Sequence, residues 1–402
     1  MRPFEGRRVL LGVTGGIAAY KSATLARELT LAGAEVDVVL TRSAREFIGT
    51  ITFEALTGRP VHDQLVAAGH ALDHIRLPRA AHVMVVAPAT ADFIARAAIG
   101  RADDLLTASL LAAGDVPVLV VPSMNDRMWA HPQVQRNVAR LREIGYHVLD
   151  PEVGPLASRE EGSGPGRMPE PSTIRAHIAR LLEPASSLRG KQVVVTAGPT
   201  REALDPVRFL SNHSSGKMGV ALAAAAWRRG AEVTLVAGPL GVAIPVGPRV
   251  VSVESTQEMA DAVRHSLTNA DVLIMAAAPA DFRAERPARQ KIKKGATSPS
   301  LALAATTDIL QSTRDARRAG CVVVGFALET EDLEANARAK LVAKELDLIA
   351  ANEAGEGTGP GYDTNRVTLL GRDGSAVELP LQSKIDVADA ILDRVAGLLD
   401  GR

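Results

Sequence analysis

The stretch RRVLLGVTGG at residues 7–16 joins an apolar, β-branched run to a turn of small residues, and this pattern recurs through the first half of the chain. Similar runs follow as AEVDVVLTRS (34–43), AHVMVVAPAT (81–90) and VPVLVVPSMN (116–125). The segments between them, such as residues 17–33, have the composition of helices. Nearly continuous apolar strands that alternate with helices are typical of a parallel sheet covered on both faces. The first half is therefore predicted to be an α/β domain.

The same alternation begins again in the second half of the chain. Its strands are expected at residues 191–200, 231–239, 270–279, 321–330 and 347–355. Between the two series lies EPASSLRG, residues 183–190, whose Pro, Ser and Gly content suits a linker. We predict two Rossmann-like domains with mainly parallel sheets, at 1–184 and 191–402, joined by a linker at 185–190.

The overall composition excludes several classes of protein. Lys plus Arg equals Asp plus Glu at 46 each among 402 residues, so no basic field favours nucleic acid as a partner. The one cysteine, Cys321, rules out an intrachain disulfide and a cysteine-based zinc site, and we interpret it as a core residue. No apolar run is long enough to span a membrane, and the N-terminus lacks the pattern of a signal peptide. We expect a cytoplasmic protein.

Ligands of open parallel sheets bind beyond the carboxyl ends of the strands, so the residues at those ends are the candidate site residues. Thr14, Gly15 and Gly16 follow the first strand, and they suit a phosphate at the start of a helix. In the second half, SNHSSGKMG at 211–219 is similar to a phosphate-binding loop. It fails the P-loop pattern at both ends, with Ser211 in place of the first Gly and Met where Ser or Thr should follow the lysine. It is predicted to hold some other anion.

The motifs of the first half together resemble the flavin-containing cysteine decarboxylases, in particular phosphopantothenoylcysteine decarboxylase. They are the glycine turn, DHIRL, APATAD and PSMNDRMW, within residues 6–175. The resemblance implies an FMN site made by Thr14, Gly15, Gly16, Thr41, Ala89 and Thr90. It also implies that His74 and Asn125 are catalytic and that Met128 and Arg167 contact the substrate. In that chemistry FMN supplies the electron sink that a decarboxylating cysteine lacks.

The chain departs from this family in one segment. The family carries a cysteine in a flap with the pattern C-G-x-x-G-x-G-R-M, and that cysteine donates the last proton. Here the segment is LASREEGSGPGRM, in which residues 164–168 match but no cysteine precedes them. Ser158 is a candidate replacement, although a hydroxyl is a much weaker acid than a thiol. Two alternatives stay open: an active ligase fused to an impaired decarboxylase, and a flavoprotein half that only binds FMN and regulates.

The second half resembles phosphopantothenate–cysteine ligase, most specifically in DPVRFLSNHSSGKMG at 205–219. The resemblance implies CTP as co-substrate, an acyl-cytidylate intermediate held by Asn212, and Mg²⁺ bound mainly through the CTP phosphates. The implied CTP-binding residues are Asp281, Lys291, Thr307, Asp308, Ile309, Leu310, Phe326, Lys340 and Lys344.

Taken together, the two resemblances imply a bifunctional enzyme of coenzyme A biosynthesis. It would join 4′-phosphopantothenate to L-cysteine and then decarboxylate the product to 4′-phosphopantetheine. The families also imply a homo-oligomer, with trimer-based flavin sites, possible dodecamers and dimers of the ligase half. A tandem NAD-dependent oxidoreductase is disfavoured, because the sequence lacks G-x-G-x-x-G and the acidic residue that follows it.

Overall fold

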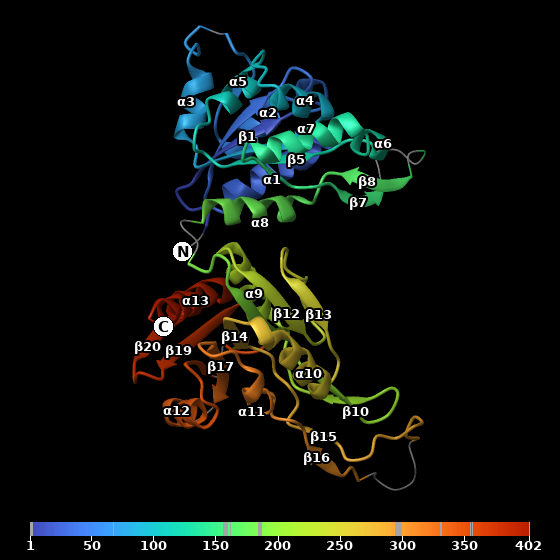
Figure 1. Ribbon diagram of the computed structural model, residues 1–402, viewed down its shortest axis with the longest axis vertical. Coiled ribbons are helices and arrows are strands. Elements are labelled where there is room, and N and C mark those ends of the chain that lie inside the picture. Colours follow the sequence, from blue (N-terminus) through green and yellow to red (C-terminus); the bar gives the residue numbers. More distant parts are fainter. Residues whose placement is uncertain are drawn as a thin grey trace. The chain divides into compact units, whose positions relative to one another are not determined.

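The computed structural model describes residues 3–66, 68–155, 160, 162–183, 187–293, 300–329, 332–353, 355 and 357–401. Ser158 therefore lies outside the described residues. The chain divides into two compact units, Met1–Pro184 and Ala185–Arg402, and each is described by itself (Figure 1). Among the described residues, no helix has the length and apolar character needed to cross a bilayer.

The first unit is built on a six-stranded parallel sheet with the order β3-β2-β1-β4-β5-β6. Its strands are β1 (Arg8–Val13), β2 (Glu35–Leu40), β3 (Val61–His62), β4 (Val83–Ala89), β5 (Val118–Pro122) and β6 (His147–Val148). Its helices are α1 (Ala19–Leu31), α2 (Thr50–Thr57), α3 (Asp73–Ala80), α4 (Ala91–Ala98), α5 (Leu105–Leu111), α6 (Asp126–Trp129), α7 (Pro132–Glu143) and α8 (Pro171–Leu182). A hairpin of β7 (Glu152–Pro155) and β8 (Ser163–Arg167) lies beside α6 (Figure 1).

Helices cover both faces of this sheet because its strands are apolar on both sides. Along β1, Val9 and Leu11 pack with α1, α2 and α8, whereas Leu10 packs with α3, α4, α5 and α7 on the other face. All seven residues of β4 are buried. Burial of these side chains stabilises the unit by about 1.5–3 kcal/mol for each large one.

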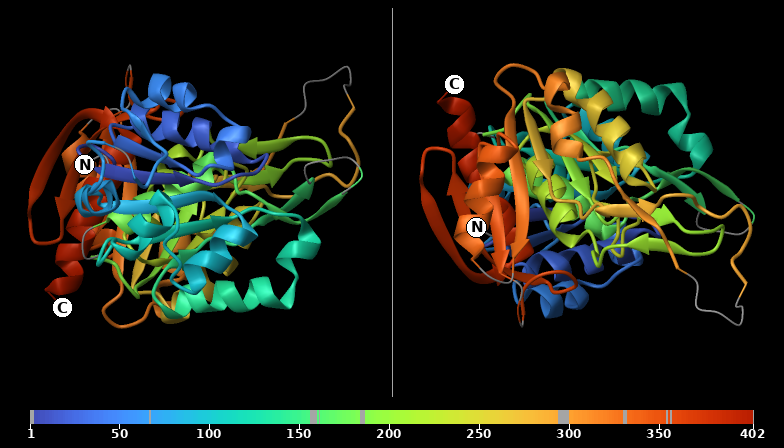
Figure 2. Two further views of the ribbon diagram at one scale, coloured as in Figure 1. Left: turned by 90° about the horizontal axis from the view of Figure 1, so that it is seen from above. Right: turned by 90° about the horizontal axis from the view of Figure 1, so that it is seen from below.

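The second unit has an eight-stranded sheet with the order β13-β12-β9-β14-β17-β18-β19-β20. The strands are β9 (Gln192–Ala197), β12 (Glu232–Ala237), β13 (Arg249–Ser252), β14 (Val272–Met275), β17 (Val322–Glu329), β18 (Leu348–Glu353), β19 (Thr364–Gly371) and β20 (Ala376–Ser383). The first six are parallel, and β19 and β20 add an antiparallel edge, drawn in red in Figures 1 and 2. The predicted fold class, two Rossmann-like α/β domains with mainly parallel sheets, is confirmed.

Two helices cover one face of the second sheet, and shorter helices cover the other. The helices are α9 (Lys217–Arg228), α10 (Thr256–Ser266), α11 (Ile309–Ser312), α12 (Leu333–Ala343) and α13 (Lys384–Asp400). Helices α9 and α13 pack together on one face, and α10, α11 and α12 contribute to the core on the other, where Cys321 is buried. Two small hairpins, β10 (Arg201–Ala203) with β11 (Phe209–Ser211) and β15 (Phe282–Ala284) with β16 (Leu303–Ala305), extend from this unit (Figure 2).

The order of the strands is built up in the same way in both sheets, and it indicates where a ligand would bind. In each, the chain starts at a central strand, builds outward on one side, and then crosses to the other side. The crossing lies between β1 and β4 in the first sheet and between β9 and β14 in the second. The carboxyl ends of two such neighbouring strands diverge and leave a crevice, which is where ligands bind in this class of fold.

Candidate functional sites

A cavity of about 570 Å³ opens at the β1–β4 crossing of the first unit. Its wall includes six of the residues predicted from the sequence: Gly15, Gly16, Thr90, Asn125, Met128 and Arg167. Apolar side chains make much of the remaining wall, among them Ile17, Met124, Pro155 and Met168. The size and the apolar lining are those of a small-molecule site.

The glycine turn after β1 is shaped by close packing. A Cβ atom on Gly15 would lie 2.3 Å from the Cβ of Ser43 and 2.8 Å from that residue's backbone carbonyl, so a side chain there would displace the turn. A Cβ on Gly16 would meet only Thr90, at 4.0 Å. Gly15 therefore brings the turn against the end of β2, and Gly16 keeps the cavity open.

Three predicted flavin-site residues form the structure behind this wall and do not line the cavity. Thr14, Thr41 and Ala89 are 2%, 6% and 0% exposed. The Thr14 hydroxyl donates to the Pro88 carbonyl at 2.8 Å and accepts from the Thr90 backbone N–H at 3.1 Å, which ties the ends of β1 and β4 together. Their side chains position the loops that do reach the cavity.

Polar groups at two helix starts face the cavity. Thr90 caps α4 by accepting from the Phe93 N–H at 3.3 Å, and Asn125 caps α6 by accepting from the Arg127 N–H at 2.9 Å. Backbone N–H groups at the first turn of a helix favour anions. The first turn of the eight-residue helix α4 therefore suits an anion, whereas much of the remaining cavity wall is apolar.

Lys21 is a cavity residue that the sequence reasoning missed. Its side chain is only 7% exposed, and its ammonium donates to the Met168 carbonyl at 2.7 Å and pairs with Glu170 at 3.0 Å. Glu170 also pairs with Arg167. The hydrogen bond from Lys21 is the main reason that the pKa of Glu170 lies below its usual value. In the sequence, Lys21 could have been noticed because it falls on the face of α1 that is otherwise made of small and apolar buried residues.

The structure does not bring His74 to the cavity of its own chain. His74 lies in the first turn of α3 and is absent from the cavity wall. Its Nδ1 atom is buried and has no hydrogen-bond partner among the described residues. Leu72 and Ile75 beside it are 66% and 45% exposed, so two apolar side chains flank His74 at the surface, next to the charged Arg76.

The second unit carries two adjoining cavities, of about 300 Å³ and about 520 Å³, at the β9–β14 crossing. Both are lined by Ala277, Pro279, Asp281, Phe326 and Lys340. Because the two cavities share this wall, they form one extended site.

The smaller cavity is lined by eight of the nine residues that were predicted to bind CTP. They are Asp281, Thr307, Asp308, Ile309, Leu310, Phe326, Lys340 and Lys344. Lys344 pairs with Asp308 at 2.8 Å, and the Lys340 ammonium donates to the Phe326 carbonyl at 2.7 Å. Burial raises the pKa of Asp308, but the bond from Lys344 and backbone N–H groups outweigh it and hold that pKa below its usual value. The ninth residue, Lys291, is exposed in the segment between β15 and β16 and lines neither cavity.

The larger cavity is formed around the loop that precedes α9. Asn212 lines it and donates from its side-chain amide to the Pro279 carbonyl at 2.9 Å, a bond that joins the loop to the residues after β14. Gly216 begins α9 with a φ of +78°, and a Cβ there would lie 2.3 Å from Leu240. Only glycine suits this position, which points the first turn of the twelve-residue helix at the cavity.

Two lysines line the larger cavity: Lys217 belongs to the loop predicted to hold an anion, whereas Lys384 was not recognised from the sequence. The Lys217 ammonium pairs with Asp363 at 2.7 Å and donates to the Gly361 carbonyl at 2.8 Å. Lys384, at the start of α13, is 7% exposed and donates to the Gly359 carbonyl at 3.0 Å. Burial, followed by repulsion from Lys217, lowers the pKa of Lys384. Two cations beside a helix start make this end of the cavity suited to a phosphate or a polyphosphate.

Two family models match the chain, one over each half. Residues 2–183 match the flavoprotein family, and residues 188–399 match the DNA/pantothenate metabolism flavoprotein C-terminal domain. The Coenzyme A biosynthesis bifunctional protein CoaBC of Mycolicibacterium smegmatis is 46% identical, over 98% of each chain. The protein of that name from Vibrio vulnificus is 44% identical, over 99% of this chain and 100% of its own.

Solved structures resemble each half separately. A crystal structure of the C-terminal domain of CoaBC is 40% identical and covers 54% of this chain and 100% of its own, with a TM-score of 0.47. A cysteine-to-serine mutant of PPC decarboxylase, complexed with pantothenoylaminoethenethiol, is 32% identical. It covers 43% of this chain and 96% of its own, with a TM-score of 0.38. From the matches over nearly the full length, the chain belongs to the family of bifunctional coenzyme A biosynthesis proteins.

Proposed function

We propose that the second unit joins 4′-phosphopantothenate to L-cysteine at the expense of CTP, and that the first unit decarboxylates the product to 4′-phosphopantetheine. The observation that carries this proposal is the extended site at the β9–β14 crossing, whose smaller cavity holds a cluster of predicted nucleotide residues and whose larger one holds the glycine loop. A nucleotide and a second substrate need adjoining pockets of this kind in order to react.

In the ligation, the cytidine part of CTP lies in the smaller cavity, against Asp281 and the first turn of α11. Lys340 and Lys344 are placed to bind its phosphates, together with Mg²⁺ carried by the nucleotide. The phosphopantothenate carboxylate attacks the α-phosphorus and pyrophosphate leaves. The cysteine amine then attacks the acyl carbon of the acyl-cytidylate and displaces CMP. Asn212 would hold the acyl-phosphate through its amide, since it lies on the wall between the loop and Pro279.

The residues around the first cavity fit FMN. The Met124 and Met128 side chains offer apolar surfaces for a flat ring system, and the first turn of α4 and the glycine turn offer N–H groups for a phosphate. Bound FMN would supply the electron sink for the thiol-bearing carbon of the substrate. Asn125 would orient the departing carboxylate by hydrogen bonding, and Arg167 would contribute a positive charge at the rim of the cavity.

We further propose that His74 serves the flavin cavity of a neighbouring copy, in a homo-oligomer. His74 lies outside its own cavity and is flanked by exposed apolar side chains, while Ile17 and Tyr20 at the cavity rim are each 61% exposed. Contact between these apolar side chains would bury them and would bring the exposed part of the His74 ring to the substrate. Trimers with flavin sites between copies would satisfy this arrangement.

A complementation experiment tests the shared site. His74→Gln and Asn125→Ala variants, each inactive in decarboxylation, are co-expressed with different affinity tags and purified as mixed oligomers. If sites are shared between copies, some sites of the mixture contain both intact residues, and activity returns. Activity that stays at the level of the single variants would contradict the shared site.

The flap segment has a second candidate acid. Counted back from residues 164–168 with the family spacing, the cysteine position is Glu160, and Ser158 lies two residues before it. Glu160 is an exposed turn residue. A carboxyl group that holds its proton gives it up far more readily than a hydroxyl does, so Glu160 in its protonated form is the better candidate for the final proton transfer.

Mass spectrometry of the products tests the whole proposal. The purified chain is given 4′-phosphopantothenate, cysteine, CTP and Mg²⁺, and the expected product is 4′-phosphopantetheine at a rate near that of CMP. Accumulation of phosphopantothenoylcysteine would support the ligase alone and would favour the impaired or regulatory flavoprotein half. Intact CTP with neither product would contradict the ligase assignment.

A further inference from the structure

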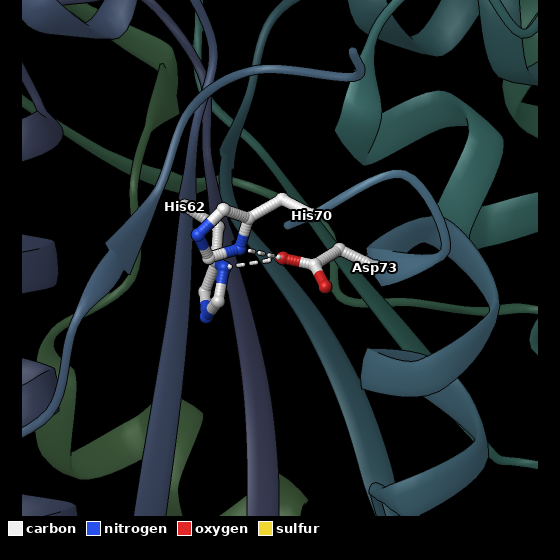
Figure 3. Close-up of side chains that lie close together, drawn as sticks. All are labelled: His62, His70 and Asp73. Atoms are coloured by element: carbon white, nitrogen blue, oxygen red, sulfur yellow. Dashed lines mark hydrogen bonds and ion pairs between the residues drawn. The ribbon is translucent and has the colours of Figure 1, made fainter. Parts of the chain in front are cut away.

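Two histidines and an aspartate converge at one point of the first unit, outside the flavin cavity. His62 ends β3, His70 lies in the following loop, and Asp73 is the first residue of α3. The Nδ1 atoms of His62 and His70 lie 3.0 Å and 2.9 Å from the same carboxylate oxygen, Oδ2 of Asp73. Figure 3 shows both imidazole rings directed at that oxygen. We propose that these three side chains bind a divalent transition-metal ion of the zinc type.

The three donor atoms form a ligand set that such ions prefer. All lie within 4.8 Å of one another, and two imidazole nitrogens with one carboxylate oxygen suit Zn²⁺, Co²⁺ and Ni²⁺ much better than Mg²⁺ or Ca²⁺. Neighbouring ligand atoms of a tetrahedral zinc site lie about 3.3 Å apart, since each is about 2.0–2.1 Å from the metal. The two distances from the histidine nitrogens to the Asp73 oxygen, 3.0 Å and 2.9 Å, therefore need to lengthen by only a few tenths of an ångström to admit the ion.

The burial of the cluster suits an ion that enters from one side. The side chains of Asp73 and His62 are 4% and 11% exposed, so they are held in place, whereas that of His70 is 51% exposed. His70 belongs to a loop and can supply the small movement that the ion requires. Its exposed side also leaves room for water as a fourth ligand, as in zinc sites with three protein ligands.

A second polar contact orients the carboxylate. Arg76 donates to the other oxygen of Asp73, Oδ1, at 2.8 Å, so Oδ2 alone is presented to the two histidines. Metal-binding carboxylates are commonly held by such outer contacts, which fix the direction of the ligand. In the absence of an ion, both histidines must carry a proton on Nδ1 in order to donate to the same oxygen. A metal ion would replace these two protons and satisfy all three groups at once.

The experiment uses the full-length chain after treatment with a chelator and desalting. Zinc chloride is titrated by calorimetry and by competition with a chromogenic zinc indicator, and cobalt chloride is added separately to record visible absorption. We expect one strong site per chain, with cobalt bands that report nitrogen and oxygen ligands in a low-symmetry site. Loss of a group that only orients a metal ligand typically weakens metal binding about 10- to 100-fold. His70→Gln removes a ligand itself, so zinc binding should weaken by at least that factor.

His70→Gln is the decisive variant because the His70 side chain is half exposed and the fold does not depend on it. His62→Gln and Asp73→Asn should also abolish the strong site. His265→Gln, which removes an exposed histidine of the second unit, is the matched control and should leave binding unchanged. Thermal unfolding without zinc shows whether each variant is folded. The proposal is overturned if the chain binds no stoichiometric zinc, or if folded His70→Gln and His62→Gln bind it as tightly as the original chain.

Discussion

Replacing Lys384 by Met should impair ligation by the second unit and leave decarboxylation by the first unit unchanged. Lys384 lines the larger ligase cavity and is 7% exposed, and its ammonium donates to the Gly359 carbonyl at 3.0 Å, beside Lys217. Methionine has a similar length and no charge, so the substitution removes the cation with little change in volume. The phosphate that Lys384 would contact then loses one charge-assisted hydrogen bond.

The size of the effect follows from that bond. A hydrogen bond to a charged group is worth about 1.5–3 kcal/mol, which corresponds to roughly 10- to 150-fold in binding or rate. The larger cavity is the pocket of the second substrate, so we expect kcat/KM for 4′-phosphopantothenate to fall by this factor, measured as pyrophosphate release at saturating CTP. Lys384→Arg keeps the charge and should lose less. Decarboxylation of supplied phosphopantothenoylcysteine should not change, because the first unit is intact.

The matched control is Lys191→Met. Lys191 precedes β9 and so lies at the amino end of that strand, away from the cavities at the carboxyl ends, where loss of a charge should not affect ligation. The reasoning is refuted if Lys384→Met keeps kcat/KM for 4′-phosphopantothenate within about twofold of the original chain, a difference of less than about 0.5 kcal/mol. An equal fall in decarboxylation would also refute it, since that result would indicate general misfolding.

The same substitution gives a test by pH. Burial lowers the pKa of Lys384 in the folded state below its value in the unfolded chain. Between these two pKa values the unfolded state binds more protons, so the contribution of Lys384 to stability rises with pH and is least favourable below the folded pKa. Denaturant unfolding of the second unit should therefore show a gain in stability on the alkaline side. Lys384→Met should abolish that gain, and an unchanged pH profile would contradict the assignment.

Three further changes test the first unit. Gly15→Ala should give colourless protein after purification, because the added Cβ displaces the turn that borders the cavity, and bound flavin is measured by absorbance. Lys21→Met leaves the Met168 carbonyl without its partner and should lower the free energy of unfolding by about 1–3 kcal/mol, measured by denaturant titration; no change would show that the contact is dispensable. Glu160→Gln should slow decarboxylation more than Ser158→Ala does, with flavin content as the control, and the reverse order would assign the proton to the serine.

The strand pattern could be predicted because the parallel strands are buried on both faces. Runs such as VLLGV and VMVVA leave no polar face, so residues 8–13 and 83–89 were recognisable as central strands. Strands β3 and β6 have only two residues each and were missed. Strand β20 was missed too, because half-exposed edge strands such as AVELPLQS lack a continuous apolar run.

Several cavity residues could be predicted because they lie in a motif that fixes the backbone. Gly15 and Asn212 lie in turns whose shape depends on their own sequence, and both line a cavity. Lys384 comes from the last helix, and nothing near it in the sequence indicates that the fold returns it to the loop before α9. Thr14 belongs to a motif but does not line the cavity, because its side chain holds the loop in place instead of facing the ligand. Membership in a motif therefore does not by itself show contact with the ligand.

The wall shared by the two ligase cavities has a consequence for inhibition. Phe326 and Lys340 line both cavities, so a molecule that fills one cavity lies next to the other. A single compound that joins a nucleoside fragment to a phosphate-bearing fragment would need a linker of only a few atoms. Its second fragment would then bind at an effective concentration in the millimolar range or above, and affinity would rise by about 10²- to 10⁴-fold without any new contact. Resistance by substitution in this wall would also impair the natural substrates, because the same side chains serve both.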